Sequence, residues 1–208
     1  MQSITSSLFR FEEREGRRYA FHCPYINKRF HGLDDNPYPF PNDDEELVRL
    51  DELQFIIRAL YGRTVLVPLP RHRPTMVFDA GTGTGRWAIE TALQFPKAYV
   101  IGMDISPVQP TDVPENCEFR YGDITDCLDD FDDGYYDFVH SRYIFSLISH
   151  RDSCVRFVML GIKDAQWRPY IESLYRMLKP GGWIQAGEMC QPTWEGNDVP
   201  AGSYYQRV

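Results

Sequence analysis

The sequence has no pattern typical of a disulfide framework, a metal centre or a membrane anchor. Its five cysteines, Cys23, Cys117, Cys127, Cys154 and Cys190, show neither a CxxC pair nor the Cys/His spacing of a zinc site. We therefore expect reduced thiols and no metal, as in a cytoplasmic or nuclear protein. No apolar run approaches the roughly 20 residues that cross a bilayer, and the N-terminus lacks a signal pattern. A soluble protein without a membrane partner is expected.

Positive charge is also scarce. The chain has 22 Lys and Arg against 30 Asp and Glu, which gives a formal net charge of -8. Without a basic stripe to neutralise phosphates, a nucleic-acid partner is not expected, and acidic substrates are disfavoured for the same reason. The chain has 208 residues, of which 43% are hydrophobic. That is enough for one sizeable core in one main domain.

Residues 1–41 differ in composition from the rest of the chain. They are polar, punctuated by proline, and rich in aromatic residues between Tyr19 and Phe40. We expect an irregular N-terminal arm that packs on the main domain, either over a ligand site or as plain packing. Residues 42–208 then form the main domain. It begins with a helix to about Tyr61, capped by Asn42 or Asp43, whose acidic first turn is a helix-start signal.

The stretch from Thr75 to Glu90 is the most informative part of the chain. A short apolar run ending at Asp79 is typical of a buried parallel strand. Glycines then alternate at Gly81, Gly83 and Gly85, which allows a tight turn and a close backbone approach to a ligand. Residues 86–95 follow as a helix, with an apolar face of Ala88, Ile89, Ala92, Leu93 and Phe95. Strand, glycine turn and helix together predict a nucleotide-type site.

Strands and helices alternate through the rest of the domain. Further strands are predicted over residues 98–104, 118–121, 135–140 and 183–189, and a helix over 165–178 that ends in a turn at 179–182. We expect this helix to bury a stripe of Trp167, Ile171, Leu174, Tyr175 and Leu178. This alternation predicts an α/β fold, a Rossmann-like, doubly wound, mostly parallel sheet with helices on both faces.

Three acids stand at the ends of three of these strands. Asp79, Asp104 and Asp123 should converge with the glycines at the carboxyl ends of the strands. A dinucleotide fingerprint needs a glycine where this chain has Arg86, and no GK[ST] follows for a phosphate loop. Asp79 would repel a pyrophosphate and favour an ammonium or sulfonium group, which S-adenosylmethionine carries. The plainer interpretation is a turn cap at Asp79 and loop-start acids at the other two positions.

Several motifs resemble a known family. DAGTGTG, Asp104, the GD at Gly122-Asp123 and LKPGGW resemble, in order and spacing, the class I S-adenosylmethionine-dependent methyltransferases. GTGTGRWAIE, VIGMDISPVQP and LKPGGWIQAGE are similar to a fungal methyltransferase-like group of secondary metabolism, which includes regulators that associate with velvet factors. The resemblance implies a methyltransferase that uses S-adenosylmethionine and a small-molecule acceptor. The alternative is a non-catalytic or weakly catalytic regulatory protein that acts through protein partners.

The resemblance also implies which residues bind the cofactor. The glycine loop would contact the methionine part, Asp104 the ribose, and Asp123 with Ile124 the adenine. The full predicted cofactor set is Asp79, Gly81, Thr82, Gly83, Gly85, Asp104, Ile105, Asp123 and Ile124.

His140, at the end of the fourth predicted strand, is the candidate catalytic residue. A histidine there could act as general base if the acceptor arrives protonated, and Ser141 and Arg142 could orient that acceptor. A buried structural histidine is the alternative. His22 and His31 are weaker candidates, and Trp87 is expected in the core.

The chain departs from the family at two places. Residues 143–156 interrupt a continuous pattern between two arginines, which suggests an insertion such as a retained intron. The family's last two strands are also not recognisable after the fifth predicted strand, so we expect them to be missing.

Overall fold

A computed structural model describes most of the main domain and part of the N-terminal arm. The described residues are 11–14, 16–20, 42–124, 131–143, 149–151, 154–156 and 164–187. The predicted arm residues 21–41, which include His22 and His31, lie outside them, as do residues 188–208.

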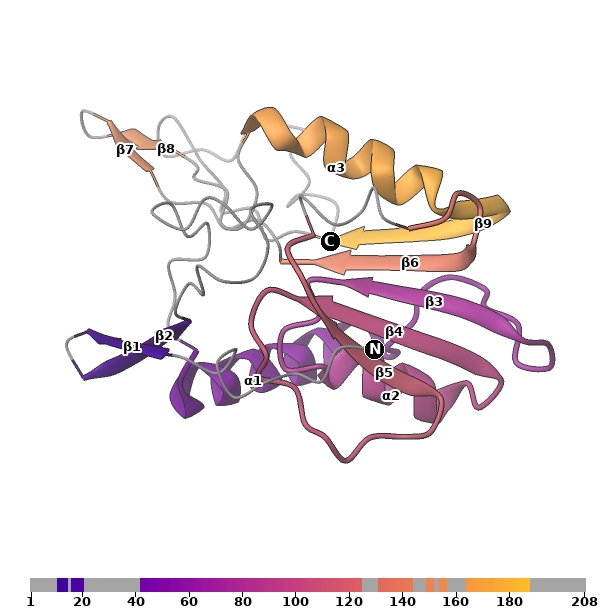
Figure 1. Ribbon diagram of the computed structural model, residues 1–208, viewed down its shortest axis with the longest axis horizontal. Helices are drawn as coiled ribbons and strands as arrows, with labels where there is room; N and C mark the ends of the chain where they lie inside the picture. Colours follow the sequence, from indigo (N-terminus) through magenta and orange to yellow (C-terminus); the bar gives the residue numbers. More distant parts are fainter. Residues whose placement is uncertain are drawn as a thin grey trace.

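The described elements alternate between strands and helices (Figure 1). In chain order they are β1 (Phe11–Arg14), β2 (Arg17–Ala20), α1 (Asp44–Tyr61), β3 (Thr75–Ala80), α2 (Arg86–Gln94), β4 (Ala98–Asp104), β5 (Cys117–Tyr121), β6 (Tyr136–Arg142), β7 (Ser149–Arg151), β8 (Cys154–Arg156), α3 (Asp164–Arg176) and β9 (Leu178–Gly187).

The central sheet is parallel throughout. Its strand order is β5-β4-β3-β6-β9, and every neighbouring pair runs in the same direction. From β3 the chain first adds β4 and β5 on one side and then crosses back to add β6 and β9 on the other. This reversal leaves a switch point between β3 and β6. The predicted doubly wound α/β fold is confirmed. Ligands of such sheets bind at the carboxyl ends of the strands beside the switch point.

Helices cover both faces of the sheet, as Figure 1 shows with α3 on one side and α1 and α2 on the other. On the α2 side, Val77, Val100 and Phe138 of three strands pack against Trp87 and Ala88. On the α3 side, Phe78, Ile101 and Val139 pack with Tyr170 and Leu174. Alternate residues of each strand therefore enter opposite cores, which explains why these strands read as continuous apolar runs.

The first helix begins and ends as predicted. Asp43 accepts a hydrogen bond from the Glu46 backbone N–H at 3.1 Å, and Gly62 ends the helix in the left-handed conformation. The leucines of this helix are not all buried, since Leu60 is 74% exposed.

The predicted faces of the other two helices need corrections. Leu93 and Tyr175 are exposed rather than buried, whereas Tyr170, outside the predicted stripe, is in the core. Trp87 is in the core, as predicted. Trp167 lies outside the residues whose side chains are described. A helix face is set by what packs against it, and the apolar period alone did not distinguish a core position from a rim position.

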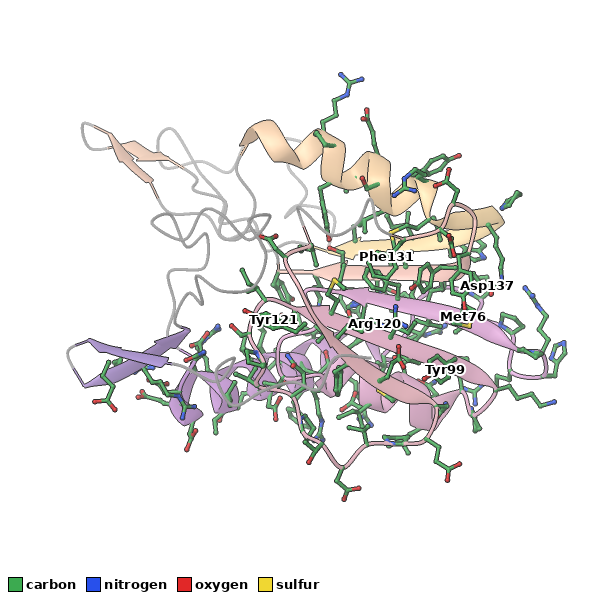
Figure 2. The ribbon with its side chains drawn as sticks, viewed as in Figure 1. Met76, Tyr99, Arg120, Tyr121, Phe131 and Asp137 are labelled. Carbon is green, nitrogen blue, oxygen red and sulfur yellow. The ribbon has the colours of Figure 1, made fainter. Side chains whose placement is uncertain are left out.

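The strand predicted over residues 183–189 begins earlier than expected. Residues 179–182, predicted as a turn, lie inside β9, where the register against β6 shifts between Tyr136 and Phe138. The residues predicted to form a turn lie at a β-bulge instead, where Gly181 has a φ of 77°. Asp137 fixes this irregular end, because its carboxylate accepts hydrogen bonds from the Met76 backbone N–H and from Lys179 (Figure 2).

The N-terminal arm is not wholly irregular. The strands β1 and β2 pair as an antiparallel hairpin, with Gly16 at a φ of 74° between them. Arg17 forms a bidentate contact with Asp43, which joins the hairpin to the start of α1. The ion pair lowers the pKa of Asp43 well below its usual range. The charged residues in the sequence of the hairpin indicated such a contact with α1, but only an irregular arm was predicted.

Within the described ranges, no helix is long and apolar enough to cross a membrane.

Candidate functional site

A cavity of about 160 Å³ opens at the carboxyl ends of β3, β4 and β6. One wall is the glycine loop between β3 and α2, and another is the side of α1. Of the residues predicted from the sequence, the cavity lining includes Asp79, Gly81, Thr82, Gly83, Asp104, Ile105, Asp123, Ile124 and His140. Sequence reasoning therefore found most of one side of this cavity.

The glycine loop is shaped by contacts with the end of β4. The backbone N–H groups of Gly81 and Thr82 both donate to the Met103 carbonyl at 2.9 Å. Gly83 donates its N–H to the Asp104 carboxylate at 2.7 Å and has a φ of 57°, a conformation that favours glycine. A Cβ at Gly83 would lie 3.8 Å from Leu50 of α1. The loop therefore runs closely between the sheet and α1.

Asp104 occupies an unusual position for a carboxylate. It accepts backbone N–H bonds from Gly83 and from Ser106, the latter at 2.9 Å. Burial nevertheless raises its pKa to about 6, because the desolvation of the charge outweighs these hydrogen bonds. A carboxylate with a raised pKa at the mouth of a cavity is a candidate for binding ligand hydroxyl groups.

Asp79 and His140 form a buried pair across the switch point. They occupy paired positions on the adjacent strands β3 and β6, so their side chains meet on one face of the sheet. The Nδ1 atom of His140 lies 2.7 Å from an Asp79 carboxylate oxygen, and Thr82 donates its hydroxyl to the other oxygen at 2.6 Å. The His140 ring stacks on Trp87 with centroids 3.7 Å apart. The contacts with Asp79 and Trp87 thus fix the orientation of the imidazole, and Thr82 fixes that of Asp79.

The other nitrogen of this histidine has no hydrogen-bond partner among the described residues. The Nε2 atom of His140 is buried, and the side chain lines the cavity. Burial lowers the pKa of His140, and the Asp79 carboxylate offsets this effect only in part. A neutral ring that donates its Nδ1–H to Asp79 has a lone pair on Nε2. This nitrogen can therefore accept a proton or a hydrogen bond from a bound molecule.

Two of the predicted residues lie elsewhere. Gly85 is not in the cavity lining; it caps α2 at a φ of 80°, and a Cβ there would lie 2.2 Å from the Phe119 ring. Ser141 points to the opposite face of the sheet, where its hydroxyl lies 2.8 Å from that of Tyr170. Ser141 therefore cannot orient an acceptor in this cavity, because neighbouring residues of a strand face opposite sides.

The wall formed by α1 was missed by sequence reasoning. Its lining residues are Glu46, Leu47, Leu50, Leu53 and Gln54, preceded by Asn42. The acidic first turn was interpreted only as a helix start, yet Glu46 is 5% exposed and pairs with Arg49. The leucine spacing signalled an apolar face, but nothing in the sequence indicated that this face lies over the glycine loop.

A polar chain connects α1, α2 and β6 beside the cavity. Arg142, which lines the cavity, donates to the side-chain oxygen of Gln54. Gln54 in turn donates to Glu90 at 3.0 Å. Glu90 also pairs with Arg86 at 3.0 Å and Arg58 at 3.3 Å. Burial opposes the charge of Glu90, but its hydrogen bonds and the two arginines leave its pKa lowered.

Comparison with known proteins shows the family of the chain. Residues 77–182, from β3 to the bulge in β9, match the family model described as a methyltransferase domain. The methyltransferase pytC of Aspergillus terreus is 35% identical over 210 residues, covering 99% of this chain and 55% of the relative. The secondary metabolism regulator laeA of Aspergillus fumigatus is 28% identical, covering 80% of this chain and 41% of the relative. The chain thus spans about half the length of these curated relatives.

A solved structure is also similar in shape. Human N-acetylserotonin methyltransferase in complex with SAM has a TM-score of 0.47 and 22% identity, covering 68% of this chain and 37% of that one. The family model covers half of the chain, including the glycine loop, the acids and the buried histidine of the cavity. The chain therefore belongs to the methyltransferase domain family.

Proposed function

We propose that this cavity binds S-adenosylmethionine and that the chain is the cofactor-binding part of a methyltransferase acting on a small-molecule acceptor. The observation that supports this most is the convergence of the glycine loop, Asp104, Asp123 and the Asp79–His140 pair on one cavity. The comparisons support the reaction class through the family and through the relative named as a methyltransferase.

The residues of the cavity fit such a cofactor. Asp104 can accept ribose hydroxyls beside Ile105, and Asp123 with Ile124 lies at the end of β5 for the adenine. Gly81, Thr82 and Gly83 expose backbone to the methionine part, and Asp79 adds negative charge near a cationic group. Gly85 supports this site through the packing of α2. When bound, S-adenosylmethionine supplies an electrophilic methyl group on its sulfonium.

The chain's own residues would then bind the cofactor, orient the acceptor and remove the acceptor's proton. Leu50, Leu53 and Ile105 surround the cavity with apolar groups and limit water. His140, held by Asp79 and Trp87, presents its Nε2 lone pair to the cavity and would accept the proton of an acceptor hydroxyl or ammonium. His140 keeps its Nδ1 proton, which it donates to the Asp79 carboxylate; this carboxylate stabilises the imidazolium and need not change its own protonation.

Calorimetry tests whether the chain binds this cofactor. The chain should bind S-adenosylmethionine and S-adenosylhomocysteine at micromolar concentrations and show no heat with NAD. Asp104→Ala should weaken this binding at least tenfold, whereas Asp112→Ala, an exposed acid of the next loop, should leave it unchanged. Binding of NAD without S-adenosylmethionine would overturn the proposal.

Methyl transfer is tested with a labelled methyl group and a fungal metabolite extract. His140→Gln keeps a hydrogen-bonding group toward Asp79 but removes the base, so we expect transfer to fall about 10²- to 10⁴-fold with unchanged cofactor affinity. If affinity and thermal stability fall while transfer per bound cofactor persists, His140 is structural. The same assay on a chain without residues 143–156 tests the proposed insertion, since removal of foreign residues should not reduce transfer.

A regulatory protein that acts through protein partners is the second candidate. It is favoured by the similarity to a relative that is named as a secondary metabolism regulator. Tight cofactor binding with no methyl incorporation into any metabolite fraction would favour this role. Incorporation into a small molecule that depends on His140 would exclude it as the main function. We expect such a protein in the cytoplasm or the nucleus.

A further inference from the structure

Arg142 is the last residue of β6 and lies two positions after His140. Residues at this spacing on a strand share one face, so Arg142 and His140 both project toward α1 and α2. Arg142 lines the cavity and is half-buried. Arg142 and His140 thus line the same cavity.

The charge of Arg142 has no carboxylate partner within the described part of the chain. Its side chain donates to the neutral oxygen of Gln54, and the guanidinium lies 5.3 Å from the centre of the Tyr143 ring. Burial lowers the pKa of Arg142, and nearby acids offset this effect only in part. An arginine has five N–H donors, so one contact with an amide oxygen leaves capacity for a planar anion.

The acids near Arg142 are already engaged. Asp79 is bonded to His140 and Thr82, and Glu90 is neutralised by Arg58 and Arg86. Arg86 also lines the cavity, but its charge is compensated by Glu90 at 3.0 Å. The charge of Arg142 is therefore available to a ligand, whereas that of Arg86 is compensated by Glu90. Arg86 serves as a matched control.

Charge is distributed unevenly along the cavity. Asp104 ends β4 and Asp123 follows β5 on one side of β3, whereas Arg142 ends β6 on the other side. Neighbouring strands lie about 4.8 Å apart, so roughly 15 Å of sheet separates the end of β5 from that of β6. A ligand that spans the cavity meets hydrogen-bond acceptors at one end and an uncompensated cation at the other.

We propose that Arg142 binds a carboxylate group of the molecules that occupy this cavity. This inference rests on the proposed function for the identity of those molecules. Two sources offer the same chemistry: the amino-acid carboxylate of S-adenosylmethionine and the carboxylate of an acidic acceptor. Arg142 holds the anion in a bidentate contact, and Gln54 positions the guanidinium from α1.

The cofactor arm compares S-adenosylmethionine with decarboxylated S-adenosylmethionine, which keeps the sulfonium and the amine. If Arg142 binds the cofactor's carboxylate, the chain binds the complete cofactor about 10- to 100-fold more tightly. This preference disappears in Arg142→Gln, is partly retained in Arg142→Lys and is unchanged in Arg86→Gln. Circular dichroism and a thermal melt show whether each variant is folded.

The acceptor arm uses benzoate and the isosteric neutral probe benzamide, with and without S-adenosylhomocysteine, observed by saturation-transfer NMR. If Arg142 binds an acceptor's carboxylate, benzoate binds and benzamide does not, and Arg142→Gln removes the benzoate signal while cofactor affinities stay the same. The inference is overturned if folded Arg142→Gln changes neither the cofactor preference nor benzoate binding. Failure of the wild-type chain to bind any cofactor counts against the proposed function, and the benzoate comparison without cofactor still tests Arg142.

Discussion

Asp104 lowers the stability of the ligand-free chain when it is charged, and the same carboxylate is proposed to bind the ligand. Its pKa rises from 3.8 to about 6 on folding, so between these values the folded chain binds more protons than the unfolded chain. The free energy of unfolding must then decrease as the pH rises from about 4 to 6. A charged Asp104 thus destabilises the ligand-free chain at neutral pH.

Asp104→Asn should therefore stabilise the chain at pH 7.5 and weaken cofactor binding. One pKa unit corresponds to 1.36 kcal/mol, and the loss of one backbone hydrogen bond subtracts from the gain, so we expect about 1–2 kcal/mol. Urea titrations at pH 4 and pH 7.5 measure the change, which should be present only at the higher pH. A variant that is less stable at pH 7.5 would contradict this account.

His140 should stay neutral at pH 7 with its proton on Nδ1. Burial lowers its pKa and Asp79 accepts the Nδ1–H, so Nε2 should have the chemical shift of an unprotonated nitrogen. Long-range ¹H–¹⁵N spectra recorded between pH 5 and 8 test this, with the exposed His72 as an internal reference. Protonation of both His140 nitrogens at pH 7 would remove its candidacy as a base.

At the scale of elements, the contact between α2 and β5 depends on the absence of a side chain at Gly85. The Phe119 ring of β5 fills the space that a Cβ would need, and the φ of 80° adds strain for any other residue. A glycine of the sequence motif therefore has a packing role, since it brings the start of α2 against the sheet.

Gly85→Ala should destabilise the chain by about 2–4 kcal/mol, through strain at a positive φ and overpacking. Adding Phe119→Ala should recover part of the overpacking term but none of the backbone strain. The coupling between the two substitutions in a double-mutant cycle, measured by urea unfolding, should therefore be favourable by at least about 0.5 kcal/mol. Strict additivity would show that Phe119 does not restrict Gly85.

At the scale of the whole molecule, α1 joins the ligand cavity to the outer layer of the fold. It lines the cavity through Leu50 and Gln54 and contacts the glycine loop through an Asp51–Thr84 hydrogen bond of 2.6 Å. The described contacts of the hairpin β1–β2, by contrast, are with the start of this helix, through Asp43, Asp44 and Glu45. Ligand binding should accordingly act on α1 more than on the hairpin.

Hydrogen exchange tests this arrangement. S-adenosylhomocysteine should slow amide exchange at least tenfold in residues 46–54 and 81–86, and leave α3 on the far side of the sheet unchanged. The comparison between α1 and α3 within one experiment is the control. Equal protection of both helices would indicate global stabilisation rather than contact with α1.

Net charge does not describe the charges inside the cavity. The overall excess of acids predicts that acidic substrates are disfavoured, which stays a prediction, whereas the cavity contains Arg142 without a carboxylate partner among the described residues. The field of a whole protein and the field inside a desolvated cavity are set by different residues, since a few buried charges dominate the latter.

The sequence alone determined the order of the strands and helices of the central sheet, the glycine loop and the acids at the ends of β3, β4 and β5. These features depend on periodicity and turn chemistry within a few neighbouring residues. Only the tertiary structure decided that His140 meets Asp79 and Trp87, that α1 forms a wall of the cavity and that Gly85 faces Phe119. These contacts join residues far apart in the chain, and they follow from the strand order and the packing of helices on the sheet, which local patterns do not specify.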